Sequence, residues 1–159
     1  MKQTLLGKTL PELQQVALSV GLQKFAGKQL AEWLYVRRAS SFEQMTNISL
    51  KGRQALEEQY TIGRHEPVAE AVSKDGTKKY LFRLSGDEVK SDVFIESVYI
   101  PDNDRATLCV STQAGCKMGC KFCMTGTLGF HGQLPVGDIL NQIFSIPDSD
   151  KLTNIVYMG

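Results

Sequence analysis

Three cysteines lie close together at Cys116, Cys120 and Cys123, in the spacing C-x3-C-x2-C, and Phe122 directly precedes the third. Three thiolates on so short a segment can bind one metal centre. A [4Fe-4S] cluster held by three protein sulfurs keeps one iron free for an outside ligand, whereas the common ferredoxin cluster is closed by a fourth cysteine. The spacing therefore indicates a metal centre at which an external molecule can react.

A zinc site and structural disulfides are the alternatives that this spacing leaves open. C-x2-C is half of a common zinc motif, and Cys109 or His131 would have to complete the four ligands. The first residues, 1–4, lack the charged segment and long apolar run of a secretory signal, which argues against a disulfide-bonded secreted protein. We therefore expect a cytoplasmic protein.

The cysteine pattern with an aromatic residue before the last cysteine resembles the signature of the radical S-adenosylmethionine (SAM) enzymes, whose open iron binds SAM. The flanks at 100–116 and 119–126, including I-P-x-x-x-R-x-T-L-C at 100–109, are similar to the RlmN-type adenine-C2 methyltransferases. The related Cfr-type C8 enzymes share the cysteines but not this run. The resemblance is close over residues 95–159, whereas residues 1–90 resemble the family only in the order of their elements.

This resemblance implies methylation of adenine carbon 2 in 23S ribosomal RNA, with transfer RNA as a further candidate substrate. Carbon 2 is electron-poor and does not displace a methyl group from SAM as an ordinary nucleophile would. The family's route uses a methyl group carried on a cysteine, with a [4Fe-4S] cluster and SAM as cofactors and a flavodoxin or ferredoxin as electron donor. By the same resemblance Cys116, Cys120 and Cys123 bind the cluster. From their positions alone, Phe122 is expected to pack beside the adenine of SAM, and hydrogen bonds toward the cluster sulfurs are expected from Thr125, Gly126, Thr127 and Gly129.

Two further residues match the family's catalytic positions. Glu96, thirteen residues before Cys109, aligns with the proton acceptor for carbon 2. Cys109 aligns with a resolving thiol that forms a transient disulfide with the methyl-carrying cysteine. From position alone Glu96 would be a solvent-facing strand residue and Cys109 a small core residue, and only the family match favours catalytic roles.

The elements that must position these residues begin with helices. Thr9 and Glu12 form a capping box for a first helix that Gly21 ends, a second helix is expected at about 27–38, and Ser49 caps a third. From Pro67 the apolar residues alternate with a period of two. This pattern predicts an antiparallel sheet with strands at 68–73, 79–84 and 93–100, the first two joined by a turn at 75–76.

The last third of the chain reads as one parallel β-α-β unit. Its predicted parts are a strand at 107–111, the cysteine loop, a helix at 135–146 and a strand at 154–158. The apolar residues Ile139, Leu140, Ile143 and Phe144 are expected to be the buried face of the helix. In the resembled family the cluster loop follows the first strand of a partial α/β barrel, which agrees with this order.

These patterns predict an α+β accessory domain at residues 1–101, with helices followed by a small antiparallel sheet, and a turn at 101–104 as the domain boundary. We expect this domain to bind RNA. Residues 102–159 are expected to be the start of the radical SAM catalytic domain, an incomplete α/β partial barrel. In the family the SAM-binding motif and the methyl-carrying cysteine follow this point, so we expect the isolated chain to be inactive and the full-length enzyme to be a monomer.

Composition limits the other function classes. The formal net charge of +1 gives no whole-chain support for nucleic-acid binding, so any RNA surface must be local. No apolar stretch approaches the roughly 20 residues of a membrane span, and we expect no membrane partner. The alternative in another class is a non-catalytic zinc-binding module that interacts with RNA.

Overall fold

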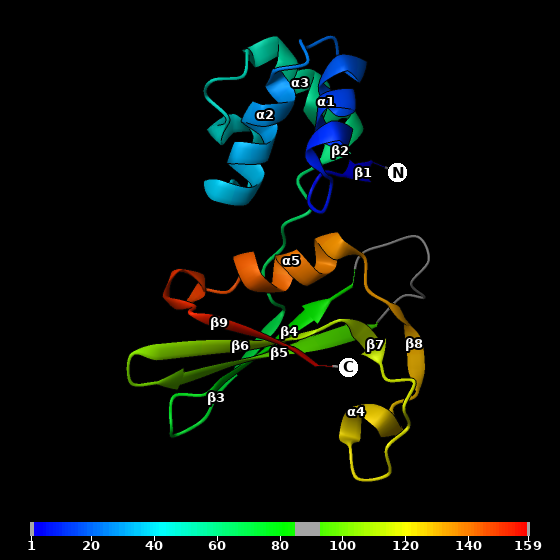
Figure 1. The fold of residues 1–159 in the computed structure, drawn as a ribbon, viewed down its shortest axis with the longest axis vertical. Helices are drawn as coiled ribbons and strands as arrows, with labels where there is room; N and C mark the ends of the chain where they lie inside the picture. Colours follow the sequence, from blue (N-terminus) through cyan, green and yellow to red (C-terminus); the bar gives the residue numbers. More distant parts are fainter. Residues whose placement is uncertain (1, 85–92, 159) are drawn as a thin grey trace. The chain divides into compact units, whose positions relative to one another are not determined.

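The protein is described by a computed structural model that covers residues 2–84 and 93–158. The chain forms two compact units, Met1–Arg64 and His65–Gly159. The first is mostly helical, and the second is built on a five-stranded sheet (Figure 1). This division differs from the boundary expected after residue 101. The antiparallel strands assigned to the accessory domain instead pair with the first strand of the β-α-β unit, in one sheet.

The N-terminal unit contains the three helices that the sequence predicts. The capping box is present, since the Thr9 backbone N–H donates to Glu12 Oε2 at 2.6 Å. The Ser49 hydroxyl accepts from the Gly52 N–H at 3.2 Å and caps the third helix. The elements are β1 (Gln3–Thr4), α1 (Leu10–Ser19), α2 (Ala26–Ala31), a π-helical turn (Glu32–Val36), a 3-10 turn (Phe42–Gln44), α3 (Leu50–Gln59) and β2 (Tyr60–Thr61).

This unit has its own core and joins its two ends. Strands β1 and β2 pair in parallel, so the first residues of the unit are hydrogen-bonded to its last ones. Fully or almost fully buried apolar side chains from all three helices meet inside it, and each contributes roughly 1.5–3 kcal/mol by leaving water. They include Leu13, Leu30, Leu34, Met45 and Leu56. Residues 1–64 are therefore a domain in the physical sense.

The second unit is built on a mixed sheet with the strand order β3-β4-β5-β6-β9. Neighbouring strands run antiparallel except β6 and β9, which are parallel. The predicted turn at Asp75–Gly76 joins β3 and β4, and Gly76 has a φ of +86°, which glycine adopts without strain. The strands are β3 (Ala69–Val72), β4 (Lys78–Arg83), β5 (Phe94–Asp102), β6 (Arg105–Ser111) and β9 (Asn154–Met158).

The turn expected as a domain boundary is instead the tip of a hairpin inside the sheet. Asp102 and Arg105 pair across β5 and β6, and Asn103 between them has a φ of +46°. Asparagine is one of the few non-glycine residues that tolerate this conformation. The sequence correctly predicted a turn at 101–104, but the residues that favour turns occur in hairpins as well as in linkers between domains.

The predicted β-α-β unit is confirmed as β6, α5 (Val136–Phe144) and β9, with α5 across one face of the sheet (Figure 1). The prediction of its buried face is wrong in part. The four apolar residues from Ile139 to Phe144 are only half-buried, although Ile139 and Ile143 contact the sheet core. The fully buried large side chains of α5 are Asn141 and Gln142, because their carboxamides hydrogen-bond backbone groups beneath the helix.

Candidate metal centre

The cysteine segment leaves the sheet at the end of β6, where a small two-stranded sheet projects (Figure 1). The strands of this sheet are β7 (Gln113–Gly115) and β8 (Phe130–Gln133), and the short helix α4 (Met124–Thr127) lies between them in the chain. The Cys116 N–H donates to the Gly129 carbonyl at 3.0 Å. A Cβ on Gly115, which has a φ of +71°, would lie 1.7 Å from that same carbonyl oxygen. Only glycine allows the two strands to approach this closely.

Cys123 lies directly before α4, in a short turn with Cys120. The Cys123 N–H donates to the Cys120 carbonyl at 3.1 Å. Hydrogen bonds to the Cys123 thiol from the Gly126 N–H, and from the backbone and side chain of Thr125, lower its pKa. The expectation that residues after the cysteines donate hydrogen bonds to the sulfurs of the cluster stays a prediction.

The thiols of Cys116, Cys120 and Cys123 are the side chains available to hold an iron-sulfur cluster. All four cysteines are free thiols. Among residues 2–84 and 93–158, no three Cys, His, Asp or Glu side chains lie close enough together to hold a metal ion. Three thiols nevertheless lie within eight residues, and hydrogen bonds lower the pKa of one of them, Cys123, which eases formation of the thiolate that metal binding needs. The chemistry of these donors fits a cluster held by Cys116, Cys120 and Cys123.

Several large apolar side chains around the cysteines face solvent. Phe122 is 94% exposed, and Met118, Met124 and Leu128 are also exposed. Lys117 Nζ lies 4.6 Å from the centroid of the Phe130 ring, a cation–π contact that joins the start of the loop to β8. The predicted contact between Phe122 and the adenine of SAM stays a prediction.

Glu96 and Cys109 lie on one face of the sheet, opposite the face that α5 covers. Along β6, Leu108 and Val110 are buried toward the helix, so Cys109 points to the other side. Cys109 is paired with Val98, which makes Glu96 its diagonal neighbour on β5 at about 7–8 Å between strand positions. Cys109 is therefore not in the core, the alternative considered from its position alone.

Glu96 also has a partner on the neighbouring strand. Lys79 Nζ on β4 lies 3.2 Å from Glu96 Oε1, and both side chains are about half exposed. An exposed pair of this kind adds little stability. Its effect is to place the positive charge of Lys79 beside the carboxylate of Glu96 on the open face of the sheet.

Sequence analysis missed a buried carboxylate in this unit. Asp148, whose side chain is 8% exposed, accepts from Lys151 Nζ at 2.8 Å, from Lys78 Nζ at 2.5 Å and from the Tyr80 hydroxyl at 3.2 Å. The two lysine hydrogen bonds lower the pKa of Asp148 to about 2. Because Lys78 and Tyr80 belong to β4, the group joins the segment after α5 to the sheet. No sequence pattern marks contacts between residues so far apart.

The two units also differ in charge. Residues 1–64 contain nine Lys or Arg and five Asp or Glu, a net charge of +4, whereas residues 65–159 contain nine and twelve, a net charge of −3. The whole-chain value of +1 hides this separation. None of the described helices combines the length and the apolar composition needed to cross a bilayer.

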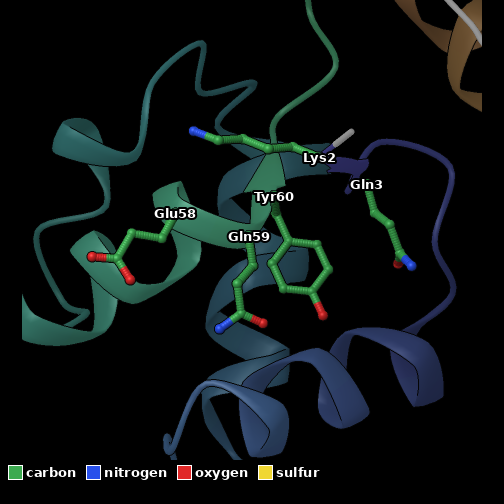
Figure 2. Close-up of a pocket in the computed structure, with 5 residues that line it drawn as sticks. All are labelled: Lys2, Gln3, Glu58, Gln59 and Tyr60. Carbon is green, nitrogen blue, oxygen red and sulfur yellow. The ribbon is translucent and has the colours of Figure 1, made fainter.

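An open hollow lies wholly within the N-terminal unit. Figure 2 shows the five side chains that line it, which come from the chain around β1 and from the end of α3 and β2: Lys2, Gln3, Glu58, Gln59 and Tyr60. The Tyr60 hydroxyl is within 3.1 Å of the Ser19 hydroxyl of α1. The hollow contains none of the predicted site residues, so it does not change the assignment of the candidate site.

Comparison with solved structures identifies the class of protein. The chain is similar to a radical SAM methyltransferase from Sphaerobacter thermophilus, with a TM-score of 0.82 and 31% sequence identity over 98% of this chain and 47% of that one. The fold is therefore that of the corresponding part of a radical SAM methyltransferase. A family model described as the ribosomal RNA large subunit methyltransferase N-terminal domain matches residues 3–62, close to the limits of the N-terminal unit.

Curated relatives identify the family. A protein of Phocaeicola vulgatus named "Probable dual-specificity RNA methyltransferase RlmN" is 56% identical over 158 residues. A Geotalea uraniireducens protein named "Dual-specificity RNA methyltransferase RlmN" is 44% identical over 151 residues. The chain belongs to the RlmN family and contains its N-terminal domain. It spans 44% and 43% of the lengths of these two relatives.

Proposed function

We propose that this chain is part of an enzyme that methylates adenine carbon 2 in 23S ribosomal RNA, and in transfer RNA, by a radical SAM mechanism with a methyl-cysteine intermediate. The observation that carries this proposal is the 56% identity with an RlmN protein over 158 residues, which includes the whole cysteine segment. The enzyme would work in the cytoplasm as a monomer, with a flavodoxin or ferredoxin as electron donor.

The cofactor would be held by the three clustered cysteines. Cys116, Cys120 and Cys123 would bind a [4Fe-4S] cluster, which with SAM supplies the radical chemistry that an electron-poor carbon requires. The hydrogen bonds from Gly126 and Thr125 support this role, since they stabilise negative charge on the Cys123 sulfur. Phe122, which is almost fully exposed, is available to pack beside the adenine of SAM.

Glu96 and Cys109 would complete the reaction on the RNA. The carboxylate of Glu96 would accept the proton that leaves carbon 2. The thiol of Cys109 would form a disulfide with the methyl-carrying cysteine and so release the product. Their positions support these roles, because both lie on the open face of the sheet as diagonal neighbours, close enough to serve one base.

RNA binding is assigned to the N-terminal unit. Its net charge of +4 gives it an attraction to phosphate that the whole chain lacks. The second unit, at −3, would instead supply the chemistry. We further propose that its sheet is the start of a partial α/β barrel, since β9 lies at the edge of the described sheet, parallel to β6, and exposes Val156, Tyr157 and Met158.

Anaerobic reconstitution tests the metal assignment. The chain should bind about four iron atoms and become brown, and replacing Cys116, Cys120 or Cys123 with alanine should abolish binding. Cys109→Ala is the matched control, because it removes a thiol on β6 and not a ligand, and it should bind iron like the wild type. Stoichiometric zinc without iron-sulfur absorption would instead support the zinc-binding module and contradict the proposal.

A further inference from the structure

The pairing between β5 and β6 ends at Cys109, two residues before the end of β6 and seven before Cys116. The last paired residues are Val98 and Cys109, so a continued ladder would pair Ser97 with Val110 and then Glu96 with Ser111. Those pairings are absent from the described sheet. Instead, the Gln142 side chain of α5 occupies the place of the missing strand partner. The Ser111 N–H donates to Gln142 Oε1 at 2.9 Å, and Gln142 Nε2 donates to the Ser111 carbonyl at 2.9 Å.

The carboxamide of Gln142 is completely buried and fully hydrogen-bonded. Its oxygen also accepts from the Ser97 hydroxyl at 2.8 Å, and its nitrogen also donates to the Asp138 carbonyl at 3.2 Å. Both Gln142 and Ser97 are 0% exposed. A buried amide with four satisfied bonds has one favourable orientation, because any rotation leaves a polar atom unpaired away from water.

The Ser111 side chain also takes the place of a backbone partner, on the β5 strand. Its hydroxyl donates to the Glu96 carbonyl at 2.7 Å, so a side chain again replaces a backbone partner. Ser111 is five residues before Cys116, and Ser97 is adjacent to Glu96. One carboxamide therefore binds both the strand that carries Glu96 and the strand from which the cysteine loop leaves the sheet.

We propose that Gln142 is a positioning residue that fixes where β6 separates from β5, and thereby places the cysteine loop relative to Glu96. For its consequence in catalysis this inference rests on the proposed function. The claim that Gln142 holds the end of β6 does not rest on the proposed function, since it concerns only the backbone of Ser111 and the loop that follows.

The preceding residue provides a matched control. Asn141 also lies on α5, is 1% exposed, and binds one backbone residue in the same two-bond manner. It accepts from the His65 N–H at 2.9 Å and donates to the His65 carbonyl at 3.1 Å. Replacing it disturbs an equally buried amide of the same helix without touching Ser111.

The variants Gln142→Met and Asn141→Leu keep side-chain size while removing the amide. Amide hydrogen exchange by NMR on the 159-residue chain should become about tenfold faster at Ser111 in Gln142→Met, the factor expected for one lost hydrogen bond. Asn141→Leu should accelerate exchange at His65 and leave Ser111 unchanged. After anaerobic reconstitution, Gln142→Met should bind less iron than Asn141→Leu.

The outcomes separate the two proposals. Unchanged exchange at Ser111, or equal iron binding in the two variants, would overturn the positioning role. If the wild-type chain binds no iron, the proposed cofactor fails, while the contrast at Ser111 still decides whether Gln142 holds the end of β6. Should Gln142→Met not fold, Ser97→Ala removes one of the four bonds and should accelerate exchange at Ser111 by a few-fold, again without an effect at His65.

Discussion

The buried carboxylate of Asp148 gives the most quantitative test of the second unit. Its pKa of about 2, compared with an ordinary 3.8, corresponds to roughly 2.5 kcal/mol of the free energy of unfolding, since one pKa unit is about 1.4 kcal/mol. The carboxylate itself is only 8% exposed, but Lys151 is 70% exposed, so solvent screening makes this value an upper limit. Asp148→Asn should therefore lower the free energy of unfolding of this unit by about 2 kcal/mol at pH 7.

The pH dependence of this effect has a definite sign. The folded-state pKa is lowered, so the ionised carboxylate stabilises the unit above about pH 4 and loses that effect as the pH falls toward about 2. The difference between wild type and Asp148→Asn should shrink over the same range. Urea unfolding followed by circular dichroism measures it, and fluorescence of Trp33, which lies in the other unit, is an internal control.

The two lysines should not contribute equally. The Lys78 side chain is 27% exposed and that of Lys151 is 70% exposed. Lys78→Ala should therefore cost more stability than Lys151→Ala, for which we expect less than about 1 kcal/mol. A difference between wild type and Asp148→Asn that stays constant from pH 7 to pH 2 would refute the electrostatic explanation, as would equal unfolding midpoints at pH 7.

Three further predictions concern the site and the domains. In a full-length RlmN protein that carries this chain, Cys109→Ala should accumulate RNA covalently attached to protein, and Glu96→Gln should slow loss of the carbon 2 proton; wild-type turnover in either variant would assign that residue a structural role. Residues 1–64 expressed alone should give a cooperative thermal transition by circular dichroism, because they have their own core, and a gradual loss of signal would contradict this. Gly115→Ala should reduce iron binding severalfold, since its Cβ would clash with the Gly129 carbonyl, and normal binding would show that the β7–β8 contact does not support the loop.

Local patterns accounted for most of the elements. The capping box at Thr9, the cap at Ser49 and the turn at Asp75–Gly76 all lie where the sequence placed them, because each depends on residues within four positions of one another. The cysteine spacing is equally local. It indicates the proposed ligands of the candidate metal centre without any knowledge of the fold.

Prediction failed where the outcome depends on distant partners. The segment at 101–104 has turn residues in either case, and only the pairing of β5 with β6 makes it a hairpin and moves the division of the chain to Arg64. Likewise, an apolar stripe predicts which side of α5 faces the sheet but not that Asn141 and Gln142 lie deepest. Their burial depends on the backbone groups of His65 and Ser111, which hydrogen-bond the two carboxamides.

The amino-acid sequence by itself determined which residues are the candidates for the chemistry, through the spacing of the cysteines and the family motif around Cys109. Tertiary structure alone decided how those residues are arranged. It placed Glu96 and Cys109 on one open face, separated a basic unit from an acidic one, and put Gln142 where the β-ladder stops. The physical reason is that the periodic pattern of a segment reports only which of its faces is buried, whereas the choice of strand partners and of buried polar contacts depends on residues far apart in the chain.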